Sequence, residues 1–236
     1  MNVRRAIVVL ALLLAAGEAR AAGGAFAVDD AAVEAAGVCK VESILSASES
    51  PPADRTAQAT PACSLAPFGH RAEFAAAFSR RRTTGEYSSP LTIKAKTPVP
   101  GLDFAKSDQF GVAVTAGYAL DHLDTANSGA FFIVVPVTYR ISDSLLFNLN
   151  IGRHQHRNEA ESYTIWGTSL EFNLKPMGLE KFTLVGEIFG AGRGETASQF
   201  GIRFSPDAKI DIDVLFGHNL NGENANWLTL GLATRF

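Results

Sequence analysis

Charged side chains recur at every second position inside apolar stretches of this chain. Asp211 and Asp213 alternate with Ile210 and Ile212, so both carboxylates share one face of an extended strand. Two neighbouring carboxylates could act as an acid and a base. Lys209 has the same parity, however, and this favours a cluster that neutralises its own charge.

The same parity gathers seven basic and six acidic residues along the chain. They are predicted to face inward: Lys40, Glu42, Arg71, Glu73, Lys94, Lys96, Glu171, Glu187, Arg203, Lys209, Asp211, Asp213 and Arg235. One interpretation is an ionic network that fills a narrow barrel. The other is a hydrated pore or small-ligand site whose wall charges tune selectivity. The near balance of sign does not indicate strong ion selectivity, and the filled barrel is favoured.

Histidines offer little further chemistry. His154 and His156 flank Gln155 and share a strand face, which could bind a transition metal, but no third ligand is identifiable. A catalytic triad needs a nucleophile beside a base, and neither these histidines nor His218 has one in a motif. We therefore predict no catalytic residue, no metal site, no cofactor and no enzyme activity.

Alternating strands must position these side chains. The final stretch, Trp227–Phe236, places Leu228, Leu230 and Leu232 on one face and small or polar residues on the other. Strands of about 10 residues match a tilted membrane crossing, whereas strands of soluble sandwiches are usually shorter. Ten strands are predicted after residue 68: 69–80, 86–96, 108–120, 129–140, 144–154, 162–173, 180–190, 197–204, 208–218 and 226–236.

The breaks between strands alternate in length. Short turns are predicted near 141–143, 175–178 and 205–207, and longer polar loops at 121–128, 155–162, 191–197 and 219–226. Bacterial membrane barrels have short periplasmic turns and longer external loops, so this alternation assigns the two ends.

The two cysteines, Cys39 and Cys63, are predicted to form a disulfide, because an even pair in an exported chain favours one. If they face each other, Val38–Ser48 and Arg55–Cys63 form a hairpin with its turn at Glu49–Ala53. Together with the ten strands this predicts an all-β, antiparallel up-and-down transmembrane β-barrel of about 12 strands. The alternative is ten strands with a periplasmic or plugging segment, Ala22–Pro67.

The N-terminus has the pattern of an export signal. Arg4 and Arg5 precede an apolar run of about 11 residues and an Ala19-Arg20-Ala21 cleavage site. We expect a signal peptide at 1–21, a periplasmic segment at 22–37 and the barrel at 38–236. The formal net charge of −3 shows no basic block that would bind nucleic acid.

Short motifs near the start, Val28-Asp29-Asp30-Ala31-Ala32, Gly37–Ser43 and Pro61-Ala62-Cys63, resemble those of a group of uncharacterised proteobacterial outer-membrane barrel proteins, including small porin-like and transporter-like barrels. Leu91–Thr97 and the last strand extend the resemblance. The ending also resembles the terminal strand of outer-membrane barrels, whose aromatic residue, here Phe236, is read by the barrel-assembly machinery. The resemblance implies a fold and a location in the outer membrane.

The predicted function is passive: a narrow pore, a small-solute transporter-like barrel or a structural barrel with a charged lumen. The alternatives are an outer-membrane enzyme acting on lipid or peptide, and a surface-loop adhesion barrel. Expected partners are outer-membrane lipid and the assembly machinery. The solute and the oligomeric state stay open.

Overall fold

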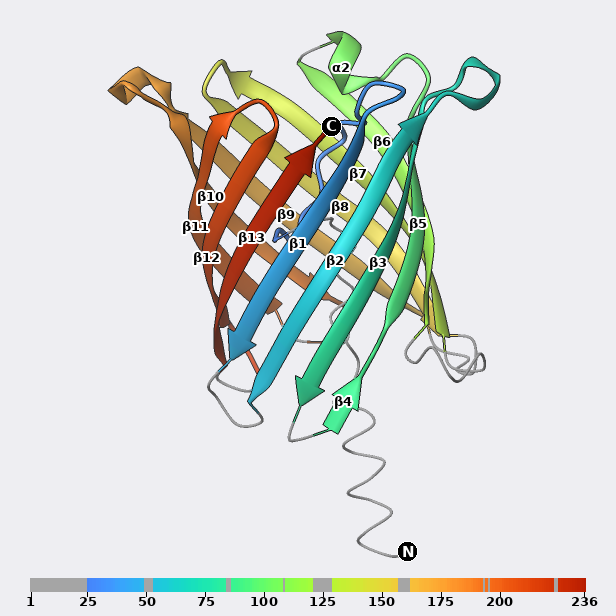
Figure 1. Cartoon of the computed structure of the whole chain (residues 1–236), viewed down its shortest axis with the longest axis vertical. Coiled ribbons are helices and arrows are strands. Elements are labelled where there is room, and N and C mark those ends of the chain that lie inside the picture. Colours follow the sequence, from blue (N-terminus) through green and yellow to red (C-terminus); the bar gives the residue numbers. More distant parts are fainter. Residues whose placement is uncertain are drawn as a thin grey trace, which may run out of the picture.

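The structure is a computed structural model, and it describes residues 25–48, 53–83, 86–107, 109–120, 129–156, 162–192, 194, 196–222 and 225–236. Its strands form one antiparallel sheet that closes on itself, because β1 pairs with both β2 and β13 and β2 pairs with β3 (Figure 1). The predicted all-β barrel of twelve strands is confirmed, with one short strand, β4, in addition. The strands are β1 (Cys39–Ser48), β2 (Asp54–Leu65), β3 (Ala72–Thr83), β4 (Glu86–Ser88), β5 (Leu91–Pro98), β6 (Phe110–Leu120), β7 (Gly129–Ser142), β8 (Leu145–His156), β9 (Ser162–Leu174), β10 (Leu179–Ala191), β11 (Thr196–Asp207), β12 (Ile210–Asn219) and β13 (Asn226–Arg235).

The β1–β2 hairpin has the predicted register. Cys39 lies opposite Cys63, and the two form a disulfide with a Cα–Cα distance of 4.0 Å. Both sulfurs belong to the outward face of the barrel, because the neighbouring Lys40 and Ala62 point inward. Residues 49–52 of the predicted hairpin turn lie outside the described residues.

Two predicted strands have different limits in the structure. The segment predicted at 86–96 is divided into β4 and β5 at Ser89 and Pro90. Pro90 has no backbone N–H for the ladder, although its carbonyl still accepts a bond from the Ser79 N–H. The strand predicted from residue 208 begins at Ile210, because Ala208 and Lys209 form the turn after β11.

Short helical pieces occur at the end of the barrel that carries the short turns. They are η1 (Pro67–Gly69), α2 (Phe104–Ser107) and η2 (Lys175–Met177). α2 lies in the long turn between β5 and β6 at the upper end in Figure 1. Phe104 of α2 lies against Gly111, where a Cβ atom would overlap it, and the Arg140 guanidinium lies 5.5 Å from its ring centre. Among the described residues, no helix has the length and apolar character needed to span a membrane.

The two faces of the wall differ in chemistry along each strand. Leu228, Leu230 and Leu232 on β13 are each close to half exposed. Trp227 and Thr229, which have the opposite parity, are buried. Exposed side chains in the outward position are Leu, Ile, Val and Phe on most strands, and buried side chains in the inward position are largely polar. An outward apolar band around a polar interior is the arrangement of a transmembrane barrel.

Candidate functional site

The inner wall carries nearly all of the charged side chains that the sequence placed there. Glu73, Lys96, Glu187, Asp211 and Asp213 are all buried, which is rare for charged groups unless they are paired. Their partners lie on neighbouring strands and on a segment that precedes the barrel.

Two sectors of the wall hold ion pairs between strands. On β1 and β3, the Lys40 ammonium lies 3.2 Å from Glu42 and 3.2 Å from Glu73. On β11 and β12, the Arg203 guanidinium donates to Asp213 at 2.8 Å. These pairs neutralise charge that the interior would otherwise leave uncompensated.

Asp211 joins β12 to the strands on either side. Its carboxylate accepts from the Ser205 hydroxyl at 2.6 Å and from the Arg235 guanidinium of β13 at 2.9 Å. The predicted acidic pair of Asp211 and Asp213 therefore forms separate ion pairs with two arginines, as the neutralised cluster requires.

The segment from Ala25 to Gly37 runs inside the barrel before β1 begins, as the blue trace in Figure 1 shows. Its backbone is bound by the wall. Glu187 accepts hydrogen bonds from the Ala27 and Val28 N–H groups, both at 3.1 Å, and the Thr138 hydroxyl accepts one from Ala31 at 2.7 Å. This segment therefore fills a part of the lumen that water would otherwise occupy.

Acidic side chains of this lumen segment, defined as Ala25–Gly37, bind basic groups of the wall. The Lys96 ammonium lies 3.0 Å from Asp29 and 3.2 Å from Asp30. At the end near β1, Arg235 donates to Glu34 at 2.8 Å. The segment thus occupies two cationic positions of the lumen with its own carboxylates.

Two apolar residues near the start of the lumen segment also lie against the wall. Phe26 presents its ring to Arg203, whose guanidinium carbon lies 4.4 Å from the ring centre. Ala25 packs with Ile44 and Leu215, and all three are buried. These contacts hold the segment at a fixed depth.

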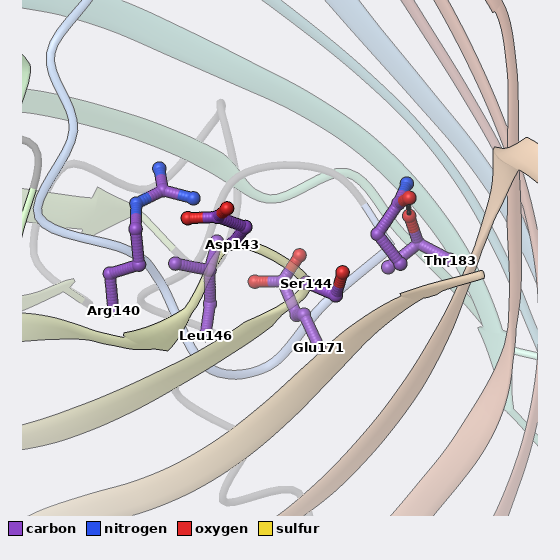
Figure 2. A pocket seen from close by; sticks show the side chains of 7 residues that line it. Arg140, Asp143, Ser144, Leu146, Glu171 and Thr183 are labelled. Carbon is purple, nitrogen blue, oxygen red and sulfur yellow. Dashed lines mark hydrogen bonds between the residues drawn. The ribbon is translucent and has the colours of Figure 1, made fainter. Parts of the chain in front are cut away.

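A polar pocket of about 260 Å³ opens inside the barrel at the short-turn end. Figure 2 shows Arg140 and Asp143 on one side of it and Thr183 on the other, with Glu171 between them. Glu171 accepts a hydrogen bond from Asn148 at 2.8 Å and lies 3.9 Å from Arg203. Of its lining residues, Arg140 also contacts α2, through the ring of Phe104.

Toward the long-loop end, the inward face carries apolar and aromatic side chains. Phe132, Val134 and Ile165 form a buried cluster with Tyr163 packed against it. His154 stacks on Tyr163 with 4.9 Å between ring centres. Among the described residues, no group of three or more His, Cys, Asp or Glu side chains is arranged to hold a metal ion.

Comparison with known proteins shows the family of this chain. A family model described as "Uncharacterised conserved protein UCP029691" matches residues 10–236. The chain belongs to this family. No curated protein matches it.

Solved structures with this fold include porins. A KdgM porin matches with a TM-score of 0.59 and 9% identity over 84% of this chain and 99% of its own. A second KdgM structure, in complex with disordered oligogalacturonate, matches with a TM-score of 0.60 and the same identity and coverage. A NanC porin matches with a TM-score of 0.57 and 8% identity over 82% of this chain and 98% of its own. At this identity the likeness shows a shared barrel fold.

Two predicted lumen residues of this family member, Arg71 and Lys209, lie outside the strands of the wall. Arg71 binds Asp103 beside α2, at 2.5 Å. Lys209 is exposed in the β11–β12 turn and does not lie on the wall, so its prediction as a lumen residue is wrong. Lys94, by contrast, lies on β5, is half-buried and has the parity of the buried Lys96.

The C-terminal residue is hydrogen-bonded to the first strand of the barrel. Phe236 exchanges two backbone hydrogen bonds with Cys39, and its side chain is 70% exposed. Recognition of Phe236 by an assembly machinery stays a prediction.

The sequence analysis considered a plug only in its ten-strand alternative, as part of Ala22–Pro67. The range 22–37 was predicted as a periplasmic segment, yet its described part makes wall contacts on β5, β7, β10 and β13. The available signal was charge: Asp29, Asp30 and Glu34 stand in a short stretch without a basic residue. An acidic stretch next to a barrel with inward basic residues is expected to form ion pairs with those residues.

Proposed function

We propose that this chain is an outer-membrane barrel that passes small anionic solutes, and that its lumen segment occupies their path. The observation that carries the proposal is the pairing of Asp29 and Asp30 with Lys96, together with that of Glu34 with Arg235. Carboxylates of the chain itself stand where carboxylates of a solute would bind.

The outward apolar band and the even number of barrel strands support a position in the outer membrane. The porin neighbours support a channel, and one of them is a complex with an acidic oligosaccharide. A narrow lumen also agrees with the strand number, because 8-stranded barrels are filled by side chains and 16-stranded porins are open.

Displacement of the segment would change the charge of the lumen. The segment brings three carboxylates, at Asp29, Asp30 and Glu34, and no basic group. When it leaves, the lumen loses these three negative charges, and Lys96 and Arg235 lose their carboxylate partners on the segment. The open state should therefore prefer anions over cations.

The test is conductance of the refolded full-length barrel in a planar bilayer under a salt gradient. The variant combines Asp29→Asn, Asp30→Asn and Glu34→Gln, which removes the ionic tethers and keeps the chain length. We expect rare openings in the unaltered protein, frequent openings in the variant, and a reversal potential that indicates anion preference. Adding Lys96→Gln to the variant should reduce that preference.

A folded variant that stays closed would contradict the proposal and favour a purely structural barrel. Openings with cation preference would keep a channel but contradict the assignment of Lys96 and Arg235 as solute-binding groups. Heat-modifiable migration on gels provides the control for folding in each variant.

A further inference from the structure

The outer wall carries a cationic cluster that the lumen does not use. Arg55 on β2 and Arg80 and Arg82 on β3 share the outward parity, and all three are exposed near the long-loop end. Arg55 lies directly opposite Arg82 across the two strands. Like charges in that position destabilise a sheet, so the pair is expected to favour an anion between or above them.

The described part of the chain offers these arginines no carboxylate. Asp54 and Arg81 pair with each other on the inward parity of the same strands, with the carboxylate and guanidinium in contact. The contacts of the outward arginines are with an aromatic ring: Arg80 and Arg82 lie 4.9 Å and 5.5 Å from the ring centre of Tyr87 on β4. The ring orders the two guanidinium groups and leaves their N–H donors available.

An apolar groove of about 650 Å³ lies in the outer wall across β2, β3, β5 and β6. Small side chains, Ala76, Ala95 and Ala116, form its floor on β3, β5 and β6, and Phe74 and Tyr118 stand at its sides. Lys94 is the one charged residue among those that line it. In a membrane, a groove of this kind is filled by hydrocarbon.

The groove and the cationic cluster lie on one strand at a spacing that suits an amphiphile. Ala76 and Arg80 are four positions apart on β3, which is about 13 Å along the strand at about 3.3 Å per residue. One leaflet of the hydrocarbon core is about 15 Å deep. A lipid with its chain on Ala76 would therefore place its headgroup close to the arginines.

We propose that this face binds a phosphate-bearing lipid of the bilayer leaflet at the long-loop end, with its acyl chain in the groove and its phosphate on Arg55, Arg80 and Arg82. Phosphate suits the cluster because a guanidinium presents paired N–H donors to two phosphate oxygens at once. The proposal is independent of the channel function, since the arginines face away from the lumen.

The test measures lipid retained by the refolded full-length barrel in native mass spectra from detergent. The two probes are dimyristoyl phosphatidic acid and dimyristoylglycerol, which differ only in the phosphate. We expect at least about tenfold stronger retention of phosphatidic acid, and about a tenfold loss of that retention in Arg55→Gln or Arg82→Gln, because each removes charged hydrogen bonds.

Arg153→Gln is the matched control. Arg153 is also exposed and outward on β8 near the same end, but its guanidinium donates to the hydroxyls of Ser162 and Thr164. This variant should retain phosphatidic acid like the unaltered protein. An equal loss in Arg153→Gln and Arg55→Gln would overturn the site, because general surface charge would then explain binding.

The groove is tested separately by Ala95→Phe, which fills its floor with a side chain that the lipid-facing wall tolerates. Retention of phosphatidic acid should fall with the cationic cluster intact. Unchanged retention would overturn the acyl-chain part of the site, and equal retention of both probes by the unaltered protein would overturn the role of phosphate.

Discussion

Glu187 is the residue whose loss should release the lumen segment most selectively. It is 3% exposed, and its carboxylate accepts from the backbone N–H groups of Ala27 and Val28 and from the Gln199 amide. Glu187→Ala removes both bonds to the segment and leaves two N–H groups inside the barrel without their acceptor.

The magnitude follows from these two bonds. About 1.5 kcal/mol is the upper end of the net contribution of a hydrogen bond between neutral groups and the lower end for a charged acceptor, so the two bonds together contribute about 3 kcal/mol. Because about 1.4 kcal/mol is a factor of ten, the ratio of released to bound segment should rise by about two orders of magnitude. The barrel itself should remain folded, since Glu187 is not part of the ion pairs of β11–β13.

Hydrogen exchange of the segment is the direct assay. Peptides covering Ala27 and Val28 should exchange about 100-fold faster in Glu187→Ala, since exchange follows the population of the open state. Glu180→Ala is the control, because Glu180 is exposed at the start of the same strand. Unchanged exchange in a folded Glu187→Ala barrel would refute the assignment of this carboxylate as the anchor. Faster exchange in peptides of β7 and β8 as well would indicate loss of the barrel and not release of the segment.

Two further predictions concern the wall. Replacing both Cys39 and Cys63 by Ser should lower the free energy of unfolding by about 3 kcal/mol, because the disulfide closes a loop with a sequence separation of 24. Urea titration measures this free energy. A change below experimental error would show that the closed barrel already restrains this hairpin. Gly201→Ala should destabilise by about 1–3 kcal/mol, because its Cβ would overlap a backbone carbonyl of β12. Gly186→Ala on the adjacent strand is its matched control, since no atom lies within 4 Å of the Cβ position there; equal midpoints for the two variants would contradict the steric argument.

Strand order and register could be predicted because each depends on local pattern. The alternation around Asp211 and Asp213 fixes which side chains face inward, and a slip of one residue would turn both carboxylates to the apolar side. The facing cysteines fix the β1–β2 register in the same way. Pro90 lies in the break between β4 and β5. The sequence analysis predicted one strand across it because the residues on either side alternate as a continuous strand would.

The ligands of the buried charges could not be predicted in the same way. Lys96 binds Asp29 and Asp30, which precede it by more than 60 positions and belong to a segment without strand periodicity. Parity identifies the face of Lys96 but not what crosses the lumen in front of it. The error at Lys209 has the opposite origin, because the predicted strand began at 208, two residues before β12, and so gave a strand parity to a turn residue.

Two of the attachments of the lumen segment differ in their expected response to salt, and under the proposed function this difference determines the order in which they break. The Glu34 and Arg235 side chains are 32% and 28% exposed, so dissolved ions reach their pair and compete with it. The bonds from Ala27 and Val28 to the buried Glu187 are shielded from such competition. An anion entering from the short-turn end would therefore displace Glu34 from Arg235 first. Release would then proceed inward along the segment toward Lys96, with Glu187 as the last attachment to break.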